Sequence, residues 1–197
     1  MNLPNKLTIL RIILVPFVIA ATLINFPFHY LVAGLLFGAA SLTDMFDGKI
    51  ARRDGLVTDF GKFLDPLADK IMVLSVLICF VEQGLCSAVP VIIIIFREFA
   101  ITSIRLVASS KGQVVASNMW GKVKTVSQIA AIVIIYLMFT IYYIVEISNP
   151  AALIFADESI YITLLLVSNI LIWITAVFAV VSGVKYMVDN RQFISEK

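Results

Sequence analysis

The chain has 197 residues, 61% of them hydrophobic, and a formal net charge of only +2. Its mean hydropathy is +1.02. Soluble globular domains are about half apolar or less, so this composition excludes an ordinary soluble domain and predicts a membrane protein.

Six apolar stretches follow one another along the chain, and each approaches the ~20 residues that a membrane-spanning helix needs. They cover residues 9–24, 30–46, 63–81, 89–107, 123–145 and 160–184. We therefore expect an all-α, polytopic membrane protein with six transmembrane helices. These helices leave no room for a separate soluble domain, so residues 1–197 should form one domain.

A short N-terminal amphipathic segment is expected before the first spanning helix. Pro4 and Asn5 should break and cap the chain, and Leu7, Leu10 and Leu14 would share one helix face. We interpret the apolar run that follows as an uncleaved helix rather than a signal peptide. Removal of that helix would reverse the charge pattern described next.

Basic residues in the connections between the predicted helices lie on one side only. The basic residues near these helix ends are Lys6, Arg11, Lys49, Arg52, Arg53, Lys62, Lys111, Lys122, Lys124, Lys185, Arg191 and Lys197. The alternate connections, at residues 25–30, 82–87 and after the fifth helix, contain no Lys or Arg. Because basic loops stay in the cytoplasm, both termini should be cytoplasmic. The short loops favour a bacterial inner, or cytoplasmic, membrane.

An acidic stretch, SLTDMFDGKIARRDGLVTDFGKFLDPLADK, joins the second and third predicted helices at residues 41–70. Asp44 and Asp47 are three residues apart, and Asp65 and Asp69 are four apart, so each pair shares a helix face. Gly55 indicates a turn between two antiparallel helices. The four carboxylates would then converge at the inner edge of the membrane.

Carboxylates gathered this closely repel one another unless cations neutralise them. Their oxygen ligands, with no Cys or His nearby, select Mg²⁺, Mn²⁺ or Ca²⁺, and two such ions can stabilise charge at a phosphoryl centre. Gly48 and Gly61 would leave space for a bulky ligand, and Arg52 could neutralise its phosphate. The alternative is that aspartates are helix caps or solvated loop residues, as expected for Asp54 and Asp59, and that the glycines serve helix packing.

The residue order in this stretch resembles a known family signature. The matching positions are Asp44, Asp47, Gly48, Ala51, Arg52, Gly61, Asp65 and Asp69, with eight residues between Arg52 and Gly61. Every position of the signature of the CDP-alcohol phosphatidyltransferases is filled at the family's spacing. The resemblance covers nearly the whole chain and implies a six-helix bundle that forms a homodimer.

The resemblance also implies a reaction, in which an alcohol attacks the β-phosphorus of a CDP-linked lipid, usually CDP-diacylglycerol, and CMP leaves. The four signature aspartates would hold two divalent cations, Mg²⁺ or Mn²⁺, on the pyrophosphate. Asp69 would also take the proton from the acceptor hydroxyl. Gly48, Arg52 and Gly61 would contact the CDP group. A carboxylate base agrees with the sequence, because the one histidine, His29, lies in a predicted outer connection.

Three further stretches, at residues 4–17, 96–112 and 121–125, resemble the phosphatidylglycerophosphate synthases, whose acceptor is sn-glycerol 3-phosphate. The expected acceptor-phosphate residues are Arg97, Arg105, Lys111, Lys122 and Lys124. The two arginines are about two turns apart in an apolar helix, where an unpaired guanidinium is costly. We expect Arg105 to close the fourth helix and the lysines to follow in the connection.

Other interpretations of these basic residues stay open. Arg97 could instead pair with Glu98 or Glu82 while the lysines extend to the membrane surface. Pairing of Arg97 with Glu98 should be awkward, because adjacent residues point about 100° apart on a helix.

Two other functions compete with the main one. The acceptor could be inositol phosphate or serine. A divalent-cation transporter is a different class of protein, but its path needs polar residues through the membrane, and the first, fifth and sixth helices offer few. The expected partners are CDP-diacylglycerol, glycerol 3-phosphate, membrane lipids and a second copy of the chain, and no nucleic acid.

Overall fold

The computed structural model describes residues 3–54, 59–110, 119–148 and 157–191. Within these ranges it describes the side chains except those of residues 3–6, 44–54, 59–66, 69, 109, 110 and 157. The regular secondary structure in the described part of the chain is entirely helical, without strands. Its helices are α1 (Leu3–Leu23), α2 (His29–Asp54), α3 (Asp59–Glu82), α4 (Ala88–Ser110), α5 (Met119–Ser148) and α7 (Asp157–Asp189).

The all-α prediction is confirmed for the described residues, which form six helices. Each predicted apolar stretch coincides with one helix, although the first stretch ends one residue after α1 does, at residue 24. Every helix extends beyond its apolar stretch. The second stretch ends at residue 46, whereas α2 continues through polar residues to Asp54. Helix hydrogen bonds do not require apolar side chains, so the helices continue past the hydrophobic boundary. Asp54 and Asp59 lie at the helix ends, as expected.

The predicted separate N-terminal segment is wrong. The helix α1 begins at Leu3 and runs without a break to Leu23. Pro4 lies in its first turn, where the missing backbone N–H would have no partner within the helix in any case. The amphipathic residues are therefore the beginning of α1.

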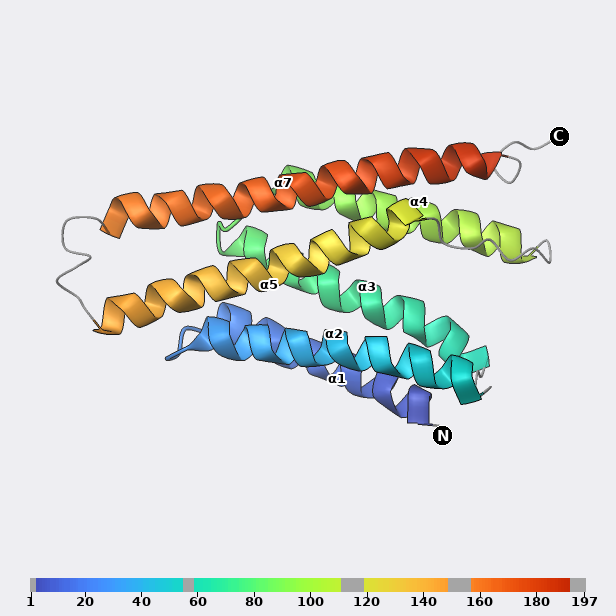
Figure 1. The fold of residues 1–197 in the computed structure, drawn as a ribbon, viewed down its shortest axis with the longest axis horizontal. Coiled ribbons are helices and arrows are strands. Elements are labelled where there is room, and N and C mark those ends of the chain that lie inside the picture. Colours follow the sequence, from blue (N-terminus) through green and yellow to red (C-terminus); the bar gives the residue numbers. More distant parts are fainter. Residues whose placement is uncertain (1–2, 55–58, 111–118, 149–156, 192–197) are drawn as a thin grey trace.

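The helices form an elongated bundle in which α1 packs against α2 and α3, while α7 packs against α4 and α5 (Figure 1). The helix α5 also contacts α2, which joins the two groups. At this contact, a Cβ atom added to Gly34 would lie 3.2 Å from Cβ of Tyr136. The two helices therefore approach closely because position 34 lacks a side chain. The largest fully buried side chains include Phe37, Phe80, Tyr136 and Phe139.

A buried polar contact ties the first helix to the fifth. The hydroxyls of Thr22 and Tyr136 are 2.7 Å apart, and Thr22 also donates to the carbonyl of Val18 at 2.7 Å. Gln83 donates to the carbonyl of Thr22 and accepts a hydrogen bond from Tyr30 at 3.2 Å. This network joins α1, α2, α5 and the end of α3.

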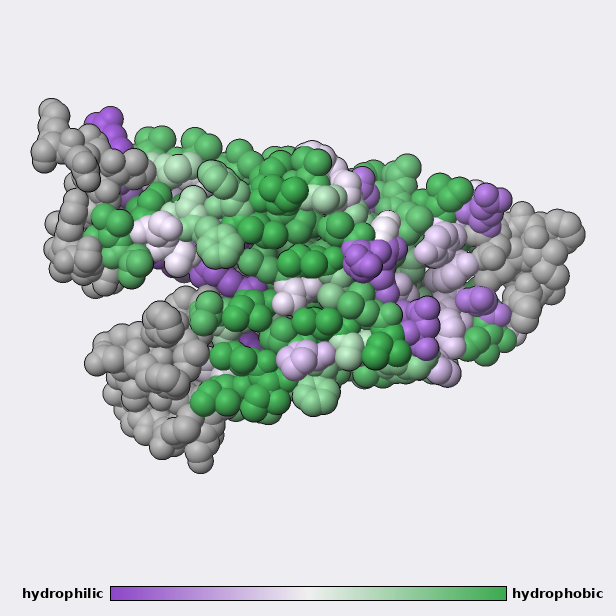
Figure 2. Space-filling view, turned by 180° about the vertical axis from the view of Figure 1, so that it is seen from behind, coloured by the Kyte–Doolittle hydropathy of each residue, from purple (hydrophilic) through white to green (hydrophobic). Residues whose placement is uncertain are grey.

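Much of the surface is hydrophobic. Leu35, Phe96 and Leu106 are 65%, 73% and 72% exposed. Figure 2 shows hydrophobic residues over much of one face, with hydrophilic residues toward its ends. By length and composition, α5 and α7 can cross a membrane, and shorter apolar helical stretches cover Leu7–Leu23 and His29–Thr43. Exposed apolar area of this extent suits a protein whose solvent is lipid.

Candidate active site

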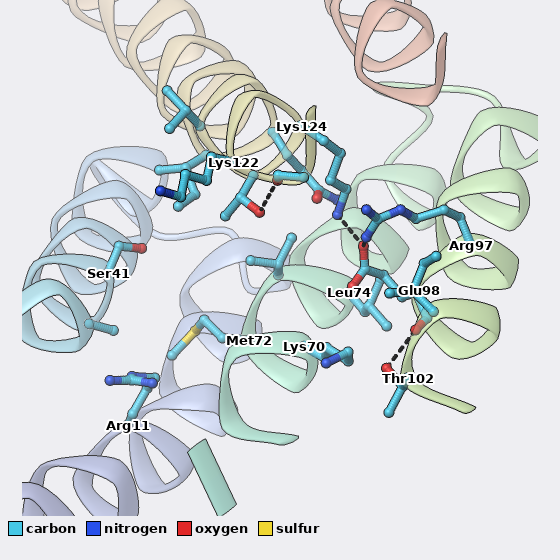
Figure 3. Close-up of a pocket in the computed structure, with 18 of the residues that line it drawn as sticks. Arg11, Ser41, Lys70, Met72, Leu74, Arg97, Glu98, Thr102, Lys122 and Lys124 are labelled. Atoms are coloured by element: carbon cyan, nitrogen blue, oxygen red, sulfur yellow. Dashed lines mark hydrogen bonds and ion pairs between the residues drawn. The ribbon is translucent and has the colours of Figure 1, made fainter. Parts of the chain in front are cut away.

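A cavity of about 640 Å³ lies between the helices, at the end of the bundle where α2 and α4 finish and α3 and α5 begin (Figure 3). Six basic residues line it, together with a single acidic residue among those described, Glu98. The basic residues are Arg11, Lys70, Arg97, Arg105, Lys122 and Lys124. Because cations predominate among the described residues of this concave site, that part of its wall suits small anions.

The signature aspartates lie on helices that border this cavity. Asp44 and Asp47 are in the last part of α2, and Asp65 and Asp69 are in the first half of α3. Their side chains lie outside the described residues, as do those of Gly48, Arg52 and Gly61. Among the described residues, no group of three or more His, Cys, Asp or Glu side chains could hold a metal ion.

Chain positions link the aspartates to the cavity nevertheless. Ser41, three residues before Asp44, lines the cavity, and so does Lys70, the residue after Asp69. The ends of α2 and α3 must also be neighbours, because five peptide units span at most about 18 Å. Both aspartate-bearing segments therefore lead directly to the wall of the basic cavity.

Glu98 joins two of the cations that the sequence indicated. Its carboxylate accepts a hydrogen bond from Nη1 of Arg97 at 2.9 Å and another from Nζ of Lys124. Nη2 of Arg97 donates to Oγ of Ser182 on α7 at 2.6 Å. All three charged side chains are largely buried, with Arg97 12%, Glu98 13% and Lys124 5% exposed.

The expectation that Arg97 and Glu98 would pair poorly is wrong. Their Cβ atoms point in different directions, but both side chains are long enough to bend toward the same cavity, where Lys124 also meets them. Removing Glu98 would leave two buried cations without their shared carboxylate, so Glu98 is the residue that holds this group together.

Arg105 is held in a different way. Its Nε donates to the hydroxyl of Tyr186 at 3.3 Å, and its guanidinium lies over the Tyr186 ring, 5.5 Å from the centroid. The prediction that Arg105 closes α4 is wrong, because that helix continues to Ser110. Arg105 itself is exposed, whereas Tyr186 is only 2% exposed. A buried aromatic ring thus fixes the direction of an accessible arginine.

One stripe on α7, formed by Ser182, Gly183 and Tyr186, contacts both arginines. A Cβ atom added to Gly183 would lie 3.0 Å from Cγ of Arg97, so the absence of a side chain lets Arg97 pass. Sequence reasoning missed this stripe because its partners are more than 80 positions away along the chain. The available signal was two small residues followed by a tyrosine on the same helix face, inside an apolar segment.

The predicted lysines differ in their surroundings. Lys122 is exposed and Lys124 is buried, and both belong to the first turns of α5 rather than to the connection before it. Lys111 lies outside the described residues. Sequence reasoning did not assign Arg11 or Lys70 to the site. Arg11 is 2% exposed, and its position inside an apolar segment was the signal that could have identified it.

Comparisons with known proteins agree with these features. The sequence profile of the CDP-alcohol phosphatidyltransferase family matches residues 1–181. A Bacillus subtilis protein is 42% identical, with 96% of this chain and 95% of the relative covered. A relative from Rickettsia bellii is 38% identical, with 98% of this chain and 97% of the relative covered. A relative from Pseudomonas fluorescens is 33% identical, with 88% of this chain and 86% of the relative covered. All three relatives are named CDP-diacylglycerol–glycerol-3-phosphate 3-phosphatidyltransferase. The chain belongs to the CDP-alcohol phosphatidyltransferase family.

Proposed function

We propose that this protein transfers the phosphatidyl group of CDP-diacylglycerol to sn-glycerol 3-phosphate, giving phosphatidylglycerophosphate and CMP. The observation that carries the proposal is the cavity, in which basic side chains gather next to two aspartate-bearing segments. The names of the relatives support the same donor and acceptor.

The acceptor phosphate binds to Arg97, Arg105, Lys122 and Lys124 in this proposal, with Lys111 as a further contributor from the connection before α5. Arg105 is the best-placed contact, because it is accessible, and its forked guanidinium can donate two parallel hydrogen bonds to a phosphate. Arg97 and Lys124 add positive charge from the wall of the cavity, where Glu98 holds them in place.

The donor binds beside the aspartates. Asp44, Asp47, Asp65 and Asp69 form a donor set of oxygen ligands without nearby Cys or His, which fits Mg²⁺ or Mn²⁺. Two such ions, when bound, would neutralise charge on the pyrophosphate. Gly48, Arg52 and Gly61 would contact the CDP group.

The chemical step needs one proton acceptor from the chain. The acceptor hydroxyl oxygen forms a bond to the β-phosphorus of the CDP-lipid, and the bond between that phosphorus and the bridging oxygen of CMP breaks. Asp69 takes the hydroxyl proton, and CMP leaves with the bridging oxygen. Lys70, next in the chain and lining the cavity, adds positive charge near this site.

The setting proposed for this reaction is a bacterial inner membrane, with six spans and both termini in the cytoplasm. The cavity lies at the bundle end that carries the basic connections, so the active site would open to the cytoplasm. The protein is proposed to act as a homodimer. The alternative of a divalent-cation transporter is opposed by the sequence, because the acidic cluster lies at one end only and α1, α5 and α7 offer few polar residues for a path through the membrane.

An acceptor comparison tests the proposal. Purified protein would be given CDP-diacylglycerol in detergent with Mg²⁺ and one acceptor at a time: glycerol 3-phosphate, inositol phosphate or serine. We expect rapid CMP release and a new lipid only with glycerol 3-phosphate. A preference for inositol phosphate or serine would contradict the acceptor assignment, and no CMP release with any acceptor would contradict the reaction.

A further inference from the structure

Gln128 is a buried polar residue in the cavity that the proposed reaction does not use. It lies on α5, lines the cavity and is only 2% exposed. Its Nε2 has no hydrogen-bond partner among the described residues. Nε of Arg97, on α4, is also buried without a partner there. Two donors without partners therefore lie in the wall of the same cavity.

Buried donors without an acceptor destabilise a folded protein unless a ligand or water accepts a hydrogen bond from them. Gln128 follows Lys124 by four residues, so both lie on one face of α5, about one turn apart. Lys124 is already bonded to Glu98 on α4. The cavity thus places a neutral donor beside cations that suit a phosphate.

The acceptor in the proposed function carries one polar group that still lacks a partner. Its phosphate has the cationic side chains, and its primary hydroxyl is the nucleophile that gives a proton to Asp69. The secondary hydroxyl on the middle carbon would enter the cavity with no assigned contact, which costs binding free energy.

We propose that Nε2 of Gln128 donates a hydrogen bond to this secondary hydroxyl and so selects glycerol 3-phosphate over phosphorylated alcohols that lack it. This inference rests on the proposed function of the chain. A neutral amide suits the role because it binds a hydroxyl without competing with the cations for the phosphate. A site built for a hydroxyl rejects the analogue without it, since the donor then stays unsatisfied.

The test compares two acceptors and two residues. The acceptors are glycerol 3-phosphate and 3-hydroxypropyl phosphate, which has hydrogen in place of the secondary hydroxyl. The variants are Gln128→Leu, which removes the donor, and Thr140→Val as a matched control. Thr140 is buried on the same helix, bonds the carbonyl of Tyr136 at 2.7 Å and does not line the cavity.

The wild type should use 3-hydroxypropyl phosphate about tenfold less efficiently in kcat/KM, because one hydrogen bond is lost and a donor is left unsatisfied. Gln128→Leu should raise KM for glycerol 3-phosphate about fivefold to tenfold and leave kcat/KM for the analogue nearly unchanged. The preference between the two acceptors should therefore disappear in this variant. Thr140→Val should keep the wild-type preference.

An unchanged preference in Gln128→Leu would overturn the inference, because the residue would then contact the phosphate or only shape the cavity. A wild type that uses both acceptors equally would overturn it as well, while leaving the proposed function intact. If Gln128→Leu does not fold, Gln128→Met, with an unbranched side chain of similar length, carries the same expectation. Failure of the wild type to use either phosphorylated acceptor would instead contradict the proposed function itself.

Discussion

Single residues in the cavity divide into those that the sequence indicated and those that only the fold reveals. The sequence predicted Arg97 and Arg105 as site residues, because an unpaired guanidinium inside an apolar helix is energetically costly. Pairing of Glu98 with Arg97 was an open alternative, but the contact of Glu98 with Lys124 was not predicted, because Lys124 comes from another helix. Gln128 was also missed, since the sequence does not reveal whether an amide has a partner.

Loss of the Arg105 side chain tests the acceptor site directly. Arg105→Ala should raise KM for glycerol 3-phosphate by about ten- to a hundredfold, because a hydrogen bond to a charged group contributes ~1.5–3 kcal/mol. The affinity for CDP-diacylglycerol should change little, since the aspartates and the CDP contacts are untouched. Arg105→Lys should lie between the two, because lysine keeps the charge and loses the fork. An unchanged KM in Arg105→Ala would remove Arg105 from the site.

Removal of the metal ions tests the role of the aspartates. EDTA treatment should abolish CMP release, and added Mg²⁺ or Mn²⁺ should restore it. Asp44→Asn keeps the shape of the side chain with less charge, so this variant should fold and yet lose activity. Full activity in protein shown to be metal-free would contradict the proposal that these carboxylates hold catalytic cations.

At the scale of helices, the sequence predicted which elements exist better than where they end. Long apolar stretches are sufficient to indicate helices in a membrane protein. The continuation of α2 to Asp54 and of α4 to Ser110 was not predictable from hydropathy, because the added residues are mostly polar or small. The support that α7 gives to Arg97 and Arg105 depends on how helices pack, which one sequence does not reveal.

Tyr186 on α7 should act as a positioning residue for Arg105. Tyr186→Leu removes both the ring and the hydroxyl that orient the guanidinium, so KM for glycerol 3-phosphate should rise severalfold while kcat changes little. Tyr186→Phe keeps the ring and should have a smaller effect. If instead both variants changed kcat as much as KM, to the same extent, and also had a lower melting temperature, the role of Tyr186 would be purely structural.

The contact between Thr22 and Tyr136 should stabilise the bundle without affecting the chemistry. Thr22→Val leaves the buried Tyr136 hydroxyl without this partner, which should lower the free energy of unfolding by about 1–3 kcal/mol. Thr163→Val is the matched control, because Thr163 is exposed and bonds only the carbonyl of Ser159 on its own helix. Melting temperatures measured in one detergent would compare them. Equal melting temperatures for the two variants would contradict a stabilising role for the buried pair.

At the scale of the whole molecule, the predicted family is confirmed, and the all-helical architecture is confirmed for the described residues. The six-span topology stays a prediction, since among the described helices only α5 and α7 are long and apolar enough to cross a membrane. The homodimer also stays a prediction. The converging helix ends explain why distant basic residues share one cavity. The sequence already indicated this arrangement, because it predicts the basic connections on one side of the membrane.

The transfer of a phosphatidyl group to glycerol 3-phosphate is tested most directly by following both products in one reaction. Purified protein would receive CDP-diacylglycerol, Mg²⁺ and radiolabelled glycerol 3-phosphate, and CMP and lipid-borne label would be measured together. We expect one labelled phosphatidylglycerophosphate for each CMP released, and neither product when glycerol 3-phosphate is omitted. CMP release without incorporation of label into lipid would show hydrolysis rather than transfer and would contradict the proposed function.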